Sequence, residues 1–238
     1  MIDSTTVGIE ARFSMGYAKR AFRLYRPVMR SARIVFVLLA ILAAETTSVE
    51  ADLATTPGES PYIAPEGKAL VVFVRKRKRL ASEVIYSIVN ERGRCIASVA
   101  NDWKVVARVE PGTQMLMVVT GVAQPQVQLL KVKAEAGKTY VVKMRPRVNA
   151  KNPVELTILR RSTEPLEMFP ASLRETGPFK PNLEECTAWV AKRQSKLATK
   201  AARAKEAWKA ADKEFRASHT IRGADGWTGD EVTGPVDD

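Results

Sequence analysis

Residues 69–74 read ALVVFV, and this run decides the fold class. All six residues are apolar, and four of them are valine or phenylalanine, which favour strands over helices. A strand that is apolar on both faces is typical of a sheet that is covered on both sides. We therefore expect Ala69–Val74 to be a central strand.

Similar short runs follow toward the C-terminus, separated by turn residues such as Asn90 to Gly93 and Pro111-Gly112. The expected further strands are Val84–Val89, Arg94–Val99, Trp103–Val109, Met115–Thr120, Val127–Ala134, Thr139–Met144 and Val154–Leu159. Short strands at close, regular intervals predict a sandwich or barrel. The sequence thus predicts a mainly β fold, an antiparallel β-sandwich-like domain of about eight strands in residues 68–161, followed by one long α-helix.

The run Val127–Ala134 does not follow a simple alternation. Val127 and Leu129 share one parity, whereas Leu130, Val132 and Ala134 share the other. Because side chains alternate between the two faces of a strand, all five cannot face one core. A β-bulge near Leu129–Leu130 would restore one apolar face, and we expect one there.

Three segments of this region carry a resemblance. The first segment is Lys68–Arg75, within GKALVVFVRKR. The second is Val109–Thr120, within VEPGTQMLMVVTG, and the third is Ala134–Met144, within VKAEAGKTYVVKMRP. Their order is similar to that of a family of small bacterial envelope (periplasmic) β domains of unknown function. The resemblance covers about residues 68–161 and implies a β-sandwich-like fold in a periplasmic or surface setting. It implies no catalytic residue.

Residues 162–181 contain four prolines and one glycine and are interpreted as a connector. We expect a basic amphipathic helix over 182–218, capped by Asn182 with Glu185 three positions later. Its apolar side would carry Trp189, Leu197, Trp208 and Phe215. This face could dock on the β domain, pair with a helix of another chain, or lie on an anionic membrane or polyanion. The acidic, Gly-rich residues 219–238 are expected to be a disordered tail.

The N-terminal region contains an export pattern. Ile34–Ala44 reads IVFVLLAILAA behind Arg30 and Arg33, and it is too short for a typical membrane-spanning helix. We interpret 29–51 as a signal peptide cut before Asp52, and 1–28 as an over-extended start or a disordered extension. Residues 52–67 would be a linker. An uncleaved anchor at residues 34–44, or a buried core helix, remains the alternative.

The charge balance favours anionic partners. The chain has 38 Lys and Arg against 26 Asp and Glu, a formal net charge of +12. The densest basic run is a candidate polyanion contact, although a solvated strand end would look the same. It consists of Arg75, Lys76, Arg77, Lys78 and Arg79.

The two cysteines, Cys95 and Cys186, lie far apart in sequence and could form a disulfide in an oxidising compartment. Two buried free thiols are the alternative. Cys95 shares strand parity with Ala97 and Val99, which would direct it to the core.

Catalytic chemistry finds no support in the sequence. His219 is the single histidine, and no nucleophile elbow or phosphate-binding loop occurs. We predict no catalytic, cofactor or metal site, and a non-catalytic exported envelope accessory or binding protein, periplasmic or secreted. Its partner would be an envelope protein or an anionic surface, and the C-terminal helix could support an oligomer. An inner-membrane-anchored protein with a periplasmic β domain and a basic nucleic-acid-binding protein are the alternatives.

Overall fold

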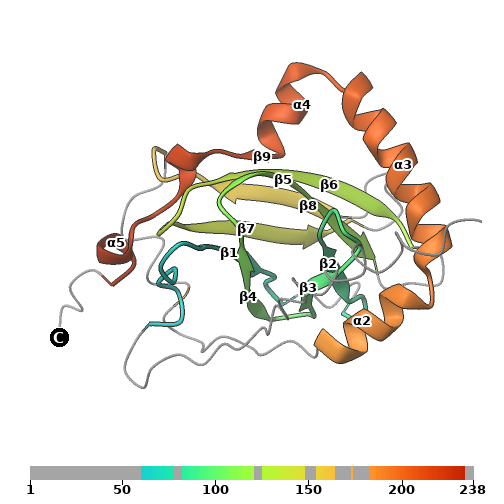
Figure 1. Cartoon of the computed structure of the whole chain (residues 1–238), viewed down its shortest axis with the longest axis horizontal. Coiled ribbons are helices and arrows are strands. Elements are labelled where there is room, and N and C mark those ends of the chain that lie inside the picture. Colours follow the sequence, from blue (N-terminus) through green and yellow to red (C-terminus); the bar gives the residue numbers. More distant parts are fainter. Residues whose placement is uncertain are drawn as a thin grey trace, which may run out of the picture. The chain divides into compact units, whose positions relative to one another are not determined.

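A computed structural model describes residues 60–77, 82–120, 125–147, 154–163, 173 and 183–233 (Figure 1). Outside the described residues lie the predicted extension 1–28, the predicted signal peptide 29–51 and residues 52–59 of the predicted linker 52–67. The same holds for Asn182, the predicted helix cap. Within the described part of the chain, no helix is long and apolar enough to cross a membrane.

The fold is mainly β and consists of two sheets. The first contains four strands in the order β4-β1-β7-β8, and the second contains five in the order β3-β2-β5-β6-β9. Their bounds are β1 Ala69–Val74, β2 Tyr86–Val89, β3 Cys95–Val99, β4 Lys104–Val109, β5 Gly112–Thr120, β6 Val127–Ala134, β7 Thr139–Pro146, β8 Val154–Leu159 and β9 Thr220–Ile221. The predicted eight strands are confirmed, and β9 is an addition.

The sheets are mixed, whereas the sequence predicted antiparallel pairing throughout. Strand β1 pairs antiparallel with β4 but parallel with β7, which arrives from the other sheet after β6. Strand β9 pairs parallel with β6. These strand directions depend on where the chain crosses from one sheet to the other. The alternation of apolar and polar residues within a strand does not encode that crossing.

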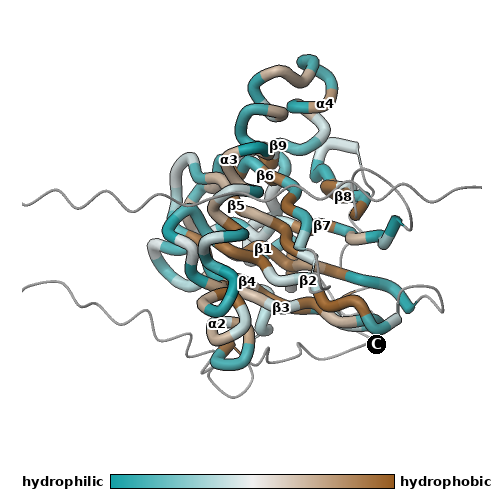
Figure 2. The backbone as a smooth tube through the Cα atoms, turned by 90° about the vertical axis from the view of Figure 1, so that its right-hand side faces the viewer, coloured by the Kyte–Doolittle hydropathy of each residue, from teal (hydrophilic) through white to brown (hydrophobic). Residues whose placement is uncertain are grey.

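The inner faces of both sheets form the central core. Ala69, Val71 and Phe73 of β1 belong to it, together with Tyr140 and Val142 of β7, and all five are almost completely buried. The second sheet contributes residues of the same alternation, among them Ile88, Leu116, Val118 and Leu130. In Figure 2 the strands carry most of the hydrophobic segments, while α3 carries long hydrophilic stretches.

The outer face of the first sheet is also apolar, and a second cluster covers it. Leu70, Val72 and Val74 of β1 point to this side. Residues from distant segments close over them: Tyr62, Leu173, Trp227 and Val232. The prediction that β1 is a central strand with two buried faces is therefore confirmed.

The expected bulge in β6 is absent. Strand β6 keeps one continuous register with β5, from Gly112 opposite Ala134 to Val119 opposite Val127. Both parities are apolar because both faces of the strand are covered: Leu130 faces the central core, and Val127 faces the helices on the outer side.

The predicted long helix is three helices: α2 Leu183–Ala191, α3 Gln194–Ala210 and α4 Lys213–Ser218. The first break lies at Lys192 and Arg193. At the second, Ala211 is extended, and the Asp212 side chain accepts a hydrogen bond of 2.6 Å from the backbone N–H of Phe215. Asp212 thus caps a new helix, a role that aspartate prefers to an interior position.

The predicted disorder of 219–238 is wrong for the described residues 219–233. After β9, a short 3₁₀ turn Gly223–Asp225 and helix α5 Gly229–Thr233 follow. Arg160 donates to Asp225 over 2.6 Å, and Trp227 exchanges two backbone hydrogen bonds with Thr139. The composition did not reveal this order, because glycine and acidic residues surround Trp227 in the sequence. In the fold, the Trp227 side chain is completely buried.

Candidate binding groove beneath helix α3

A β-bulge and a disulfide position the helices on the outer face of the second sheet. In the β2–β3 pair, Ile88 lies opposite Ala97, but Val89 lies opposite Cys95, so Ile96 is an extra residue. An extra residue reverses the face of the residues beyond it. Cys95 therefore leaves the core side that its parity with Ala97 predicted, and it bonds to Cys186 of α2.

The predicted disulfide is thus present, and it lies within a third apolar cluster. Val89, Cys95 and Val119 contribute to this cluster from the sheet, and Cys186, Val190 and Leu197 contribute from α2 and α3. Trp189 is half-buried at its margin, where the Arg193 guanidinium lies 4.5 Å from the ring centroid. The outer face of the sheet and the helices bury each other here.

The predicted docking face of the C-terminal helix divides into two. Trp189 and Leu197 pack on the β domain as one of the three alternatives proposed. Trp208 and Phe215 instead contact each other edge-to-face at 6.2 Å, and Phe215 stacks on His219 at 4.1 Å. The break at Lys192 and Arg193 places Trp189 on a separate helix from Leu197 and Trp208, and the break at Asp212 places Phe215 on a third helix.

Farther along α3, the helix and the sheet leave an open groove of about 370 Å³. Strands β5 and β6 and the β2–β3 hairpin form one wall, and α2 and α3 form the other. The lining residues are Val89, Glu91, Arg92, Gly93, Met115, Met117, Val119, Val127, Val190, Gln194, Leu197, Ala198, Ala201, Ala202 and Lys205. A concave, largely apolar space with a few polar groups is typical of ligand sites.

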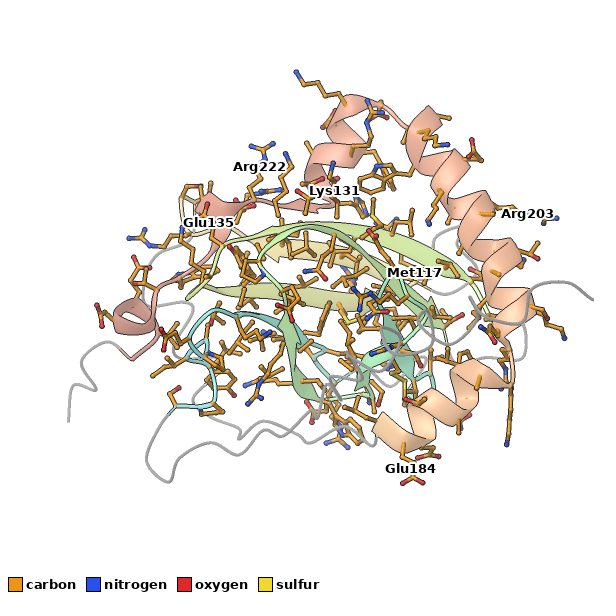
Figure 3. The ribbon with its side chains drawn as sticks, viewed as in Figure 1. Met117, Lys131, Glu135, Glu184, Arg203 and Arg222 are labelled. Carbon is orange, nitrogen blue, oxygen red and sulfur yellow. A yellow bond between two sulfur atoms is a disulfide. The ribbon has the colours of Figure 1, made fainter. Side chains whose placement is uncertain are left out.

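The groove exists because the helix presents small side chains. Ala198, Ala201 and Ala202 of α3 lie across from Met115 and Met117 of β5. An alanine cannot reach the strand, and both methionines remain half-exposed on the sheet. In Figure 3, Met117 lies on the sheet side of α3, while Arg203 extends from the helix away from the sheet.

The hairpin between β2 and β3 places the guanidinium group of Arg92 at the rim of the groove. The side-chain oxygen of Asn90 accepts hydrogen bonds of 3.0 Å from the backbone N–H groups of Arg92 and Arg94, and Gly93 takes a positive φ of 75°. A glycine adopts this conformation without the cost that a Cβ would add. The fixed turn brings Arg92 to the same groove as Lys205 of α3.

An acidic residue also lies at this rim, but the backbone engages it. One carboxylate oxygen of Glu91 accepts a hydrogen bond of 2.5 Å from the backbone N–H of Met115. Arg92 and Lys205 are both exposed, and neither belongs to an ion pair recorded among the described residues. Two basic side chains against one carboxylate give the rim a net positive charge.

The predicted polyanion contact at 75–79 is wrong for its first residue. Arg75 is 1% exposed, donates a hydrogen bond to the carbonyl of Val84, and lies 5.1 Å from the centroid of the Tyr86 ring. Burial lowers the pKa of Arg75, although the nearby Tyr86 opposes this shift. Lys76 and Arg77 are exposed, and Lys78 and Arg79 lie outside the described residues.

The single histidine has structural neighbours. Its Nδ1 lies 3.0 Å from the carbonyl oxygen of Phe215, and its Nε2 lies 2.9 Å from the side-chain nitrogen of Gln128. Burial lowers the pKa of His219, and the contact with Phe215 partly offsets this effect. No group of three or more potential metal ligands is found among the described residues.

The groove itself was not predicted, although its components were visible. Residues 182–218 were predicted only as an amphipathic helix, and Met115 and Met117 were assigned only to a strand. The register that brings the two together depends on the Ile96 bulge and on the disulfide. No protein-family model matches the chain, and no curated protein matches it.

Proposed function

We propose that this chain is a non-catalytic, exported bacterial envelope protein whose β-sandwich and C-terminal helices form a binding module. The observation that carries the proposal is the bond between Cys95 and Cys186. Stable disulfides form in oxidising compartments such as the periplasm and are rare in the cytosol. The apolar run Ile34–Ala44 behind two arginines supplies a matching export pattern.

Binding, rather than catalysis, suits the groove. Its walls are aliphatic side chains and methionines, and the polar groups at its rim are Glu91, Arg92, Gln194 and Lys205. A site of this composition holds a ligand by excluding water and orients it through a few polar contacts. Glu91 is engaged by a backbone N–H, which suits a role in holding the hairpin.

The test is fractionation of the native host, with N-terminal sequencing and alkylation of the protein before reduction. We expect a chain that begins at Asp52 in the periplasmic or secreted fraction. A peptide pair containing Cys95 and Cys186 should disappear on reduction. An intact N-terminus in the cytosol, with both thiols alkylated without reductant, would refute the proposal.

A matched pair of variants strengthens the test. Leu39→Arg places a charge in the middle of the apolar run and should keep the chain in the cytosol with reduced thiols. Leu39→Ile keeps the run apolar and should leave export unchanged. If both variants are exported equally, residues 34–44 do not direct export.

The anchored alternative predicts a different outcome in the same experiment. A chain that retains residues 34–44 and resists carbonate extraction from the inner membrane would favour it. The nucleic-acid-binding alternative loses one of its five proposed contacts, because Arg75 is buried. That alternative requires cytosolic protein whose affinity for DNA decreases steeply with added salt.

A further inference from the structure

We propose that the groove beneath α3 binds a single aliphatic chain that carries an anionic head group. The inference rests on the binding role proposed above and specifies the class of ligand. It follows from the size of the groove, the nature of its walls and the charge at its rim.

The size of the groove fits one hydrocarbon chain. An apolar cavity of about 150 Å³ accommodates one benzene ring, which has six carbon atoms. In proportion, a space of about 370 Å³ accommodates on the order of 15 carbon atoms. This number of carbon atoms corresponds to one fatty acyl chain. The groove is too small to bury both chains of a diacyl lipid completely.

The walls suit a flexible chain. Met115 and Met117 have unbranched side chains that adapt to irregular partners, whereas Ala198, Ala201 and Ala202 provide a smooth opposite wall. None of these five residues offers a side-chain hydrogen bond, so a polar or aromatic heterocyclic ligand would lose its contacts with water without compensation.

The charge at the rim selects the head group. Arg92 and Lys205 reach the groove from opposite walls, and Glu91 is the acidic lining residue. Helix α3 also carries Lys196 and Lys200, against a single acidic residue, Glu206, which pairs with Lys209. The local field therefore favours a carboxylate or phosphate and disfavours a cation.

Binding should be measured by isothermal titration calorimetry at neutral pH, with oxidised protein purified from its host. The probes are tetradecanoate, a single-chain lysophosphatidylglycerol and dodecyltrimethylammonium, each below its micelle concentration. We expect one site that binds at least one of the two anionic probes. The cationic probe should bind about tenfold more weakly or worse. The relative affinities of the anionic probes distinguish a free fatty acid from a lipid head group.

Two matched pairs of variants locate the site. Ala198→Phe should fill the groove and lower the affinity at least about tenfold, whereas Ala207→Phe, on an exposed position outside the lining, should not. Lys205→Glu should weaken the anionic probe about tenfold, and Arg203→Glu, which lies outside the groove on the same helix, should change it far less.

Three results would overturn the inference. They are the absence of binding by both anionic probes, equal binding of the cationic probe, and equal effects of the two variants in either pair. An exported, disulfide-bonded chain that binds none of the probes would remove this inference and leave the proposed compartment intact. A cytosolic chain with free thiols would remove the proposed function whatever the titration shows.

Discussion

Cys95 on β3 and Cys186 on α2 are joined across 91 positions of sequence, with their Cα atoms 6.1 Å apart. This bond fixes helix α2 to the outer face of the second sheet, next to Val89 and Val190. Val89 and Val190 also line the groove, so the bond joins the two walls of the groove at one end.

Replacing both cysteines by serine should lower the free energy of unfolding. Opening a loop of this length removes about 4–5 kcal/mol of stabilisation in the chain-entropy model. The measurement is urea denaturation with and without dithiothreitol. Reductant should lower the midpoint of the natural chain and leave that of the double variant unchanged. If the urea midpoint of the natural chain is the same with and without reductant, this expectation is wrong.

Arg75→Ala should destabilise the fold by about 2–3 kcal/mol, since it removes a buried hydrogen bond to Val84 and the contact with Tyr86. Lys76→Ala, one position later and exposed, should change stability by less than about 0.5 kcal/mol. Thermal unfolding of the two variants checks the difference. Equal losses would show that Arg75 has no special structural role.

Trp227→Ala should cost about 3–5 kcal/mol, because the ring is completely buried in the cluster over the first sheet. Trp208→Ala is the control, since that ring is half-buried near the end of α3, and the loss should be about 1 kcal/mol. Urea midpoints and limited proteolysis near the C-terminus measure both. A harmless Trp227→Ala would mean that the C-terminal segment does not stabilise the sandwich.

The pH dependence of stability should include a contribution from His219. Burial lowers its pKa in the folded state below the ordinary value of about 6.5, so the unfolded chain binds the proton more readily. The stabilisation is present above the unfolded pKa and decreases as the pH falls from about 7.5 to 5.5. Urea midpoints at these two values should differ for the natural chain and differ less for His219→Gln. An identical pH slope in the variant would exclude His219 as the source.

Strand positions could be predicted because composition determines them locally. The bounds of β1, β6 and β8 agree with the apolar runs that predicted them, and the turn at Asn90 to Gly93 formed as expected. The face of the sheet to which each side chain points was harder to predict. A bulge was expected at Leu129–Leu130 because only one buried face was assumed, and the actual bulge at Ile96 leaves no mark in the alternation.

The candidate site could be predicted only in part, because its parts meet through distant contacts. The pairing of Cys95 with Cys186 was one of two alternatives drawn from the sequence, and the packing of Trp189 and Leu197 on the sheet was one of three. The position of Phe215 on a helix separate from α3 depends on Asp212, which was interpreted as an interior helix residue although aspartate is a strong helix start.

The last described residues complete both hydrophobic layers of the sandwich. Ile221 belongs to the central core, and Trp227 and Val232 belong to the cover of the first sheet. During synthesis, the sheets therefore remain without these side chains until the segment that follows α4 has left the ribosome. Such a delay postpones stable folding of the sandwich until well after its first eight strands have been synthesised.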